Sequence, residues 1–358
     1  MLSLGIETSC DETGVAIVED GRRVISNVVA SSLSLHSKYG GVIPEIASRA
    51  QLEYIYAVAG QALKQAGLKT GHSFLGSGKG IGLVCVTAEP GLRGSLLVGL
   101  SFARGLSFCW GRPLVYVNHI KAHIYAALFS AAGRPLERRR IRFPFVGLVV
   151  SGGHTNLFLV RDFGRFVLLG RSVDDAAGEA FDKVARVLGL GYPGGPQIER
   201  LARSGRSGRV RFSCGNLDGA YDFSFSGIKT AVLYKVSKCQ SVKVSGSSSS
   251  PENRAPKTAG HPASGWVGEP STETNADIAH GFQEAVFDDI VAKSVSACIN
   301  KKVAALLVGG GVAINKRFRD KLTHSCRSHK LRVYFSPAEY CPDNAAMVAG
   351  LGYWLRRH

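Results

Sequence analysis

Short apolar runs separated by polar turns divide the chain into two halves that repeat one order of elements. Each half opens with three apolar runs of strand length, and a short polar turn joins the first two as in a β-hairpin. The pattern then changes to helices that alternate with single strands. Strands are predicted at residues 2–6, 14–18, 23–30, 81–86 and 114–117, and again at 145–150, 157–160, 166–169, 304–308 and 331–335.

The predicted helices lie between these strands. Pro44 suits the first turn of a helix and Gly67 its C-cap, which sets the bounds of the first one. Helices are predicted at residues 44–67, 94–110, 174–189, 277–299 and 343–355, with further helices after residues 118 and 311. The repetition predicts a duplicated α/β protein with a cleft between its halves. We place the two domains at residues 1–135 and 136–358.

One stretch interrupts this pattern. Between residues 236 and 275 the chain contains the run Ser245-Gly-Ser-Ser-Ser-Ser250 and four prolines. Such a composition is typical of flexible segments that bury little apolar surface. We predict a low-complexity surface insertion within the second domain, most simply a linker.

Net charge indicates the kind of partner. The 358 residues include 44 Lys and Arg against 27 Asp and Glu, which gives a formal net charge of +17. An excess of this size favours a polyanion, nucleic acid above all, although a generally basic proteome would give the same value. Ten arginines form two clusters that are predicted to be exposed: Arg134, Arg138, Arg139, Arg140 and Arg142, and Arg200, Arg203, Arg206, Arg209 and Arg211.

Cysteine spacing and hydropathy indicate a cytoplasmic protein. The eight cysteines form no Cys-X-X-Cys pair, so neither a zinc ribbon nor a disulfide framework is predicted. The first strand begins at Leu2 and leaves no room for a leader peptide. No apolar run approaches the ~20 residues that a membrane helix needs. The expected location is therefore the cytoplasm, without a membrane partner.

The clearest chemical motif is His119-Ile-Lys-Ala-His123. Two histidines four residues apart lie on one face of a helix, so both imidazoles can reach one cation. Asp343, which follows 220 residues after His123, supplies a carboxylate able to close such a site. A His/His/Asp set leaves coordination positions open for substrate oxygens. The alternative is an ordinary pair of surface or internally hydrogen-bonded helix histidines.

Glycine-rich turns follow two of the predicted strands. Ser151-Gly-Gly-His-Thr155 forms the tip of the second hairpin, where two glycines let backbone N–H groups approach a phosphate. Gly309-Gly-Gly-Val-Ala-Ile-Asn315 lies between a strand and a helix, a position that favours anions, and Asn315 is placed to hydrogen-bond a ribose or base. Both segments are also compatible with ordinary tight turns.

Acidic residues provide further candidates. Asp11 and Glu12 occupy the loop of the first hairpin, where they either hold a cation, act as a base or form a solvated turn. Asp182, with Lys183 beside it on a predicted helix, either binds a ribose hydroxyl or forms a surface ion pair.

Taken together, these segments resemble the TsaD family, the universal tRNA threonylcarbamoyltransferases, in its bacterial and organellar branch. The resemblance covers nearly the whole chain outside residues 236–275, and a bacterial type is expected. The matching segments are residues 4–13, 40–49, 90–99, 118–123, 150–155, 174–183, 191–196, 223–231, 310–315 and 343–347.

The resemblance implies the actin/sugar-kinase/heat-shock-ATPase (ASKHA) fold, with two lobes and a central nucleotide cleft. It implies transfer of the threonylcarbamoyl group from threonylcarbamoyl-AMP to N6 of the adenosine 3′-adjacent to the anticodon in tRNAs that read ANN codons, with release of AMP. It also implies a divalent metal, iron first and zinc or magnesium otherwise, held by His119, His123 and Asp343. The implied adenylate site comprises Val149, Val150, Ser151, Gly152, Gly153, Asp182, Gly195, Glu199 and Asn315.

Position alone assigns Asp11 or Glu12 as the catalytic group that accepts the amine proton. By resemblance, bacterial relatives work with a TsaB scaffold and a TsaE ATPase, while TsaC makes the adenylate. We therefore expect tRNA, threonylcarbamoyl-AMP, TsaB and TsaE as partners.

The chain departs from the family pattern at several positions. Glu89 and Ala122 stand where the family has Gly, Lys121 stands for Glu, Glu199 for Asp, and Pro342 for the Thr that precedes the metal-binding Asp. We expect these changes to alter metal or nucleotide affinity rather than to abolish activity.

Three other functions compete with this prediction. A metallo-endopeptidase is disfavoured because the motif lacks the Glu that follows the first His in HExxH proteases. A metal-dependent ATPase or kinase is suggested by fold analogy only. A non-catalytic scaffold of a tRNA-modification complex would not need the intact pair His119 and His123 or Asp343.

Overall fold

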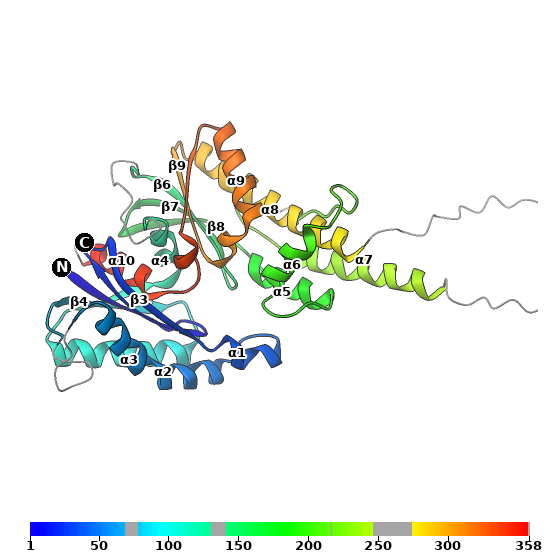
Figure 1. Cartoon of the computed structure of the whole chain (residues 1–358). Coiled ribbons are helices and arrows are strands. Elements are labelled where there is room, and N and C mark those ends of the chain that lie inside the picture. The colour runs from blue at the N-terminus through cyan, green and yellow to red at the C-terminus, as the bar shows by residue number, and fades with distance from the viewer. Residues whose placement is uncertain (69–77, 130–140, 216, 246–273, 357–358) are drawn as a thin grey trace, which may run out of the picture.

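The computed structural model describes residues 1–68, 78–129, 141–215, 217–245 and 274–356, which form two lobes built on two mixed β-sheets (Figure 1). The first sheet has the strand order β3-β2-β1-β4-β5 and the second has the order β10-β9-β6-β7-β8. The strands are β1 (Leu2–Glu7), β2 (Glu12–Glu19), β3 (Arg23–Ser31), β4 (Ile81–Glu89), β5 (Leu114–Asn118), β6 (Phe145–Val150), β7 (Thr155–Asp162), β8 (Arg165–Arg171), β9 (Ala305–Gly309) and β10 (Arg332–Phe335).

The two sheets share one topology, which confirms the predicted duplication. In each sheet, three strands form an antiparallel meander. Two later strands then extend the sheet in parallel from the first strand of the meander. The central strands coincide with the apolar runs of the sequence because β1, β2, β4, β6 and β9 are buried within their sheets, whereas the edge strand β8 exposes Val167 and Leu168.

The helices of the first half are α1 (Leu33–His36), α2 (Pro44–Gln65), α3 (Arg93–Trp110) and α4 (His119–Ala126), with the short 3-10 helix η1 (Ser37–Tyr39). Of these, α2 and α3 cover one face of the first sheet. Along β2, Val15 and Ile17 pack with α2 and α3, whereas Ala16 and Val18 belong to a separate core on the opposite face. This alternation is the one expected of a strand with two covered faces.

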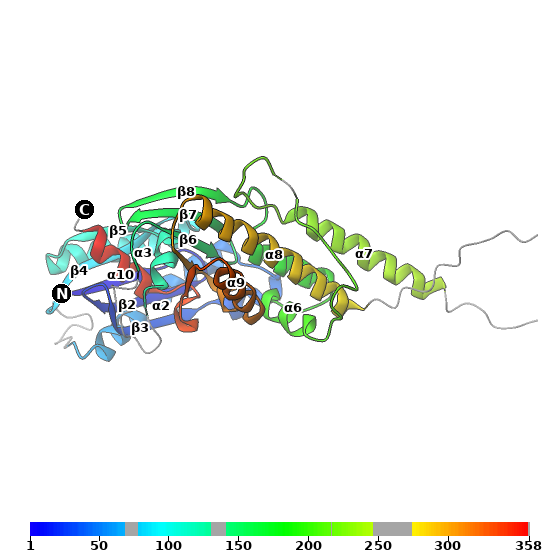
Figure 2. The ribbon, with the colours of Figure 1, turned by 90° about the horizontal axis from the view of Figure 1, so that it is seen from above.

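The helices of the second half are α5 (Ala177–Val187), α6 (Gly194–Ala202), α7 (Ser226–Ser245), α8 (Asn275–Asn300), α9 (Lys316–Ser328) and α10 (Ala345–Leu355), with 3-10 helices η4 (Gly311–Ile314) and η5 (Ala338–Tyr340). All of these α-helices except α10 contribute to the larger core. Within this core, Phe181 stacks on Phe287 and meets Phe282 edge to face. Both views show α7 and α8 side by side, extending away from the sheets (Figures 1 and 2).

The predicted insertion at residues 236–275 is partly wrong. Helix α7 continues to Ser245, so residues 236–245 are helical, and Val232 and Val236 pack into the second core. A capping box between Thr274 and Asp277 starts α8. The remaining residues of the predicted stretch, 246–273, lie outside the described part of the chain. Of the described helices, none combines the length and apolar character needed to cross a membrane.

The lobes exchange helices. α4 comes from the first half, yet its Ile120 and Ile124 pack with the second sheet. α10 comes from the second half, yet it covers the first sheet, as its position beside β1 and β4 shows (Figure 1). Both contacts need glycine. A Cβ on Gly309 would lie 2.0 Å from the His123 carbonyl oxygen, and one on Gly5 would lie 2.3 Å from the Ala345 carbonyl oxygen. The exchange places the start of α4 next to the start of α10.

Candidate metal centre and active site

The two predicted metal-binding histidines lie on α4. Asn118 caps this helix by accepting a hydrogen bond from the Lys121 backbone N–H. His119 and His123 are both buried and face the same side of the helix, with their Nε2 atoms 3.2 Å apart. The two histidines therefore share one face of the helix, as their spacing in the sequence predicts.

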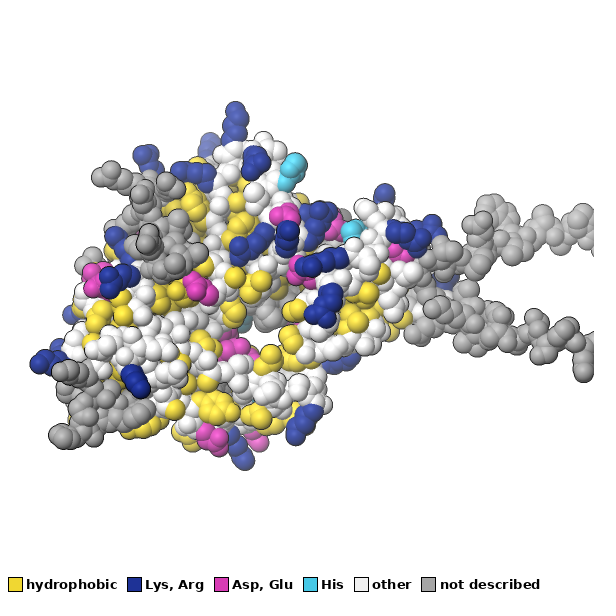
Figure 3. All heavy atoms as spheres, in the orientation of Figure 1, with side chains coloured by type: hydrophobic (Ala, Val, Ile, Leu, Met, Phe, Trp, Pro, Cys, Tyr) yellow, Lys and Arg dark blue, Asp and Glu magenta, His cyan; other side chains and the backbone are white. Residues whose placement is uncertain are grey.

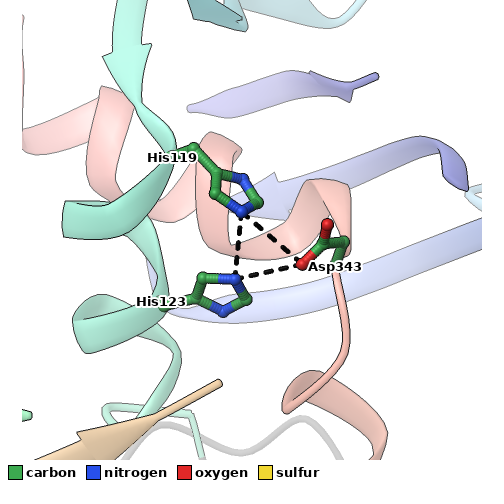
Figure 4. A group of neighbouring side chains, drawn as sticks. All are labelled: His119, His123 and Asp343. Carbon is green, nitrogen blue, oxygen red and sulfur yellow. Dashed lines mark hydrogen bonds and ion pairs between the residues drawn. The ribbon is translucent and has the colours of Figure 1, made fainter. Parts of the chain in front are cut away.

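Asp343 completes the group from the turn before α10 (Figure 4). Its Oδ1 atom lies 3.1 Å from His123 Nε2 and 3.6 Å from His119 Nε2. Asn344 fixes this turn, since its side chain caps α10 through the Met347 N–H and donates to the Pro342 carbonyl oxygen. Metal–ligand bonds of about 2.0–2.2 Å separate neighbouring ligand atoms by roughly 3.0–3.5 Å. The residues present therefore fit a divalent cation.

The charges around these three residues also favour a bound cation. Burial alone would raise the pKa of Asp343, but the two imidazoles hold it below its ordinary value. Burial disfavours charge on His119, yet the Glu7 and Asp343 carboxylates raise its pKa to about 9. Three ligand atoms thus converge in a region whose carboxylates favour a positive charge.

The first hairpin loop is buried rather than solvated. Gln51 donates to the backbone carbonyl oxygens of Cys10 and Glu12, and Asp11 is buried beside them. Burial, together with the Asp343 and Asp11 carboxylates, raises the pKa of Glu12 to about 10. The solvated-turn alternative for this loop is therefore wrong, and Asp11 and Glu12 lie in the electrostatic field of the candidate metal centre.

The predicted adenylate-site residues gather on the second lobe. Val149 and Val150 end β6, and the Ser151–Gly153 turn is closed by a hydrogen bond from the Ser151 N–H to the His154 carbonyl oxygen. This turn contacts the glycine loop after β9, because a Cβ on Gly310 would lie 2.4 Å from the Val150 carbonyl oxygen. The two glycine-rich loops are therefore neighbours.

Other predicted residues take structural hydrogen bonds. Asp182 accepts from the Gly194 N–H at 2.7 Å, next to Gly195, and burial raises its pKa. Glu199 accepts from the Lys316 N–H at 3.3 Å, at the start of α9. Asn315 caps α9 through Oδ1 and donates its amide to Gln283. These contacts hold α6 and α9 beside the glycine loops. A space-filling view shows a hollow between the two lobes, with acidic side chains at its edge (Figure 3).

Sequence reasoning missed several residues around the metal centre. Glu7 lies behind His119 and is fully buried. His154 approaches from the second hairpin, with its ring centroid 6.3 Å from that of His119. Burial and the neighbouring histidines lower the pKa of His154 to about 4, so its ring is neutral at physiological pH. Two features of the sequence could have identified these residues: Glu7 directly follows a predicted buried strand, and His154 lies within a glycine-rich turn.

The departures from the family pattern are accommodated. Glu89 accepts a hydrogen bond from the Asn118 amide at 3.3 Å and so supports the cap of α4. Lys121 points its ammonium over the Phe166 ring, 5.5 Å from the ring centroid. Pro342 supplies a carbonyl acceptor for Asn344. None of these three side chains disrupts the arrangement of the metal-binding residues.

Comparison with solved structures establishes the class of protein. The chain matches full-length HypF in its phosphate- and nucleotide-bound form with a TM-score of 0.59 at 12% identity, over 99% of this chain and 55% of that one. It matches the (R)-2-hydroxyglutaryl-CoA dehydratase component A of Acidaminococcus fermentans with a TM-score of 0.51 at 13% identity, over 100% of both chains. The protein therefore has the predicted two-lobed ASKHA fold.

Sequence comparison is more specific. The model of the TsaD family, tRNA N6-adenosine threonylcarbamoyltransferase, matches residues 23–350. A protein of that name from Symbiobacterium thermophilum is 46% identical over 99% of this chain and 92% of its own length. Another from Caldicellulosiruptor saccharolyticus is 42% identical, over 99% and 93% respectively. This chain belongs to the TsaD family of tRNA N6-adenosine threonylcarbamoyltransferases.

Proposed function

We propose that this chain transfers a threonylcarbamoyl group from threonylcarbamoyl-AMP to N6 of the adenosine 3′-adjacent to the anticodon in tRNAs that read ANN codons. Family membership supports the reaction class, an acyl transfer to N6 of a tRNA adenosine. The convergence of His119, His123 and Asp343 beside the glycine loops carries the proposal, because it joins a cation site to a phosphate-type site.

The reaction forms a bond between N6 and the carbamoyl carbon and breaks the bond from that carbon to the AMP phosphate oxygen. An exocyclic amine is a weak nucleophile, so the enzyme must position an activated donor. Backbone N–H groups of Gly152 and Gly153 are suited to the phosphate, since the Ser151 N–H already donates to the His154 carbonyl oxygen. Asp11, or Glu12 in its ionised form, takes the amine proton, and AMP leaves with the electron pair of the broken bond on its phosphate oxygen. Val149, Val150, Asp182, Gly195, Glu199 and Asn315 shape the adenylate side of the site.

The proposed cofactor is one divalent metal per chain, held by His119, His123 and Asp343. When bound, the metal supplies positive charge for the leaving phosphate. Two imidazoles and one carboxylate favour a transition metal over magnesium, which prefers oxygen ligands. Iron is our first choice and zinc the second.

The proposed partners are tRNA, TsaB and TsaE, with TsaC as the source of the adenylate, in the cytoplasm. Apolar side chains on the outer faces of α2 and α3 support a protein partner there. Leu52, Tyr56, Leu97 and Phe108 are 69%, 48%, 63% and 88% exposed. Exposed large apolar side chains on two neighbouring helices are typical of interaction surfaces.

We assign tRNA binding to exposed arginines, which include Arg142 near the start of the second lobe. The second arginine cluster, Arg200, Arg203, Arg206, Arg209 and Arg211, is likewise exposed around the end of α6. The other arginines of the first cluster lie outside the described residues. Phosphate contacts of this kind are expected to dominate tRNA affinity.

Reconstitution tests the proposed function. The chain, with TsaB and TsaE, is given threonylcarbamoyl-AMP and unmodified ANN-decoding tRNA, and nucleosides are analysed by mass spectrometry. We expect N6-threonylcarbamoyladenosine, and its loss in a His119→Ala, His123→Ala variant. Metal-dependent ATP turnover without tRNA, and no modified nucleoside, would instead favour the ATPase alternative.

A further inference from the structure

A carboxylate that the proposed reaction does not use lies behind the candidate metal centre. Glu7 ends β1 and its side chain is 1% exposed. One oxygen, Oε1, accepts the Ser9 N–H at 2.6 Å. The other, Oε2, accepts the Thr87 hydroxyl at 2.5 Å and lies 3.1 Å from His119 Nδ1. A buried carboxylate with this many donors is held in one orientation.

We propose that Glu7 is a positioning residue that sets the tautomer and ring orientation of His119 for metal binding. A carboxylate only accepts hydrogen bonds, so it keeps the proton of the neutral imidazole on Nδ1. The lone pair is then on Nε2, the atom that faces His123 and Asp343. Histidine ligands are commonly oriented by an outer carboxylate in this way. The inference rests on the proposed metal centre.

The two histidines differ in this respect. His119 Nδ1 has Glu7 at 3.1 Å and the Ser9 hydroxyl at 3.1 Å. His123 Nδ1 is buried and has no hydrogen-bond partner among the residues that the structure describes. The Glu7 carboxylate therefore positions His119 and not His123. Its loss should lower metal affinity only when His119 is present.

The isosteric variant Glu7→Gln replaces the acceptor that faces His119 Nδ1 with a donor. The amide oxygen must stay on the Ser9 side, because that backbone N–H needs an acceptor. The amide NH2 group then faces His119 Nδ1, which has to become the acceptor. The imidazole proton moves to Nε2, where it blocks the metal-binding lone pair. Size and packing are otherwise retained.

The test measures Co²⁺ affinity of the full-length chain from its visible absorption bands, with Zn²⁺ competition, and needs neither tRNA nor the adenylate. We expect Glu7→Gln to weaken binding by about 10–100-fold. Thr87→Val removes a hydroxyl donor to the same carboxylate oxygen but leaves that oxygen an acceptor for His119, and should change the affinity by only about threefold. Thermal unfolding of the apo variants checks that each is folded.

A double-variant cycle separates positioning from a general structural role. In a His119→Ala background, Glu7→Gln should cause no further loss of Co²⁺ affinity, whereas in a His123→Ala background it should still cause its full loss. Equal metal affinity of Glu7→Gln and the wild type would overturn the inference, as would the same loss in the His119→Ala background. Failure of the wild-type chain itself to bind metal would instead refute the proposed metal centre.

Discussion

Gly309→Ala is the substitution that most directly tests how the metal centre is built. An added Cβ would lie 2.0 Å from the His123 carbonyl oxygen and 2.6 Å from its carbon. Real Cβ contacts of this kind are at least 3.0 Å, so α4 or β9 would have to move by about 1 Å. Overpacking of a close-packed interior lowers the free energy of unfolding by about 1–3 kcal/mol. Because both clashing atoms belong to the backbone, we expect a loss of about 2–3 kcal/mol for Gly309→Ala.

A second glycine provides the matched control. Gly105 lies within α3, is exposed, and has no heavy atom within 4 Å of its ideal Cβ position. Gly105→Ala should therefore stabilise the protein by about 0.5–1 kcal/mol, through helix propensity and a less flexible unfolded chain. The same chemical change is thus expected to have opposite signs at the two positions.

Urea denaturation followed by circular dichroism measures both variants, and Co²⁺ titration reports the position of His123. We expect a lower denaturation midpoint for Gly309→Ala and metal affinity reduced about tenfold or more, because a ligand is displaced. The reasoning would be refuted if Gly309→Ala matched the wild type in both measurements, or if Gly105→Ala destabilised the protein as much.

Three further predictions concern charge. Although burial opposes ionisation, Arg317 and Lys321 lower the pKa of Glu284 to about 2 from 4.5; the resulting stability is full above pH 4.5 and lost as the pH falls toward 2. Glu284→Gln should therefore cost about 1–3 kcal/mol at pH 7 and little near pH 2, and an equal cost at both pH values in denaturation experiments would contradict this. Charge reversal in the second arginine cluster should weaken tRNA binding and flatten its salt dependence, so an unchanged slope of log affinity against log salt would remove the assignment. A double Asp11→Ala, Glu12→Ala variant should be slowed by about 10²–10⁴-fold in single-turnover transfer, and unimpaired transfer would exclude both as proton acceptors.

The positions of the strands along the chain could be predicted because burial leaves a direct mark on the sequence. Both sheets are covered on two faces, so their strands are continuous apolar runs such as Phe145–Val150, which matches its predicted bounds. The exchange of α4 and α10 could not be predicted in this way. Its trace in the sequence is a glycine within a strand, as at Gly5 and Gly309, and a glycine alone does not say which helix approaches it.

The candidate site was predicted where spacing or resemblance identified ligand atoms, and missed where support came from elsewhere. His119 and His123 share a helix face, so their relation is local. Glu7 meets His119 only because β1 and β5 flank β4 in one sheet. Asn315 was expected to bind a ribose or base, but its side chain caps α9 and contacts Gln283. The roles of Glu7 and Asn315 depend on contacts between segments that are far apart in the sequence.

The exchanged helices have a consequence for the synthesis of the protein. Domains generally fold in the order in which they leave the ribosome, but here the apolar face that contains Ala16 and Leu83 is covered by α10, which is made after the entire second sheet. The first lobe is therefore completed last, at the same moment as Asp343 reaches the two histidines. A chain that stops before residue 343 has neither a covered first sheet nor the third ligand of the proposed metal centre, so that centre can form only after the second lobe has been made.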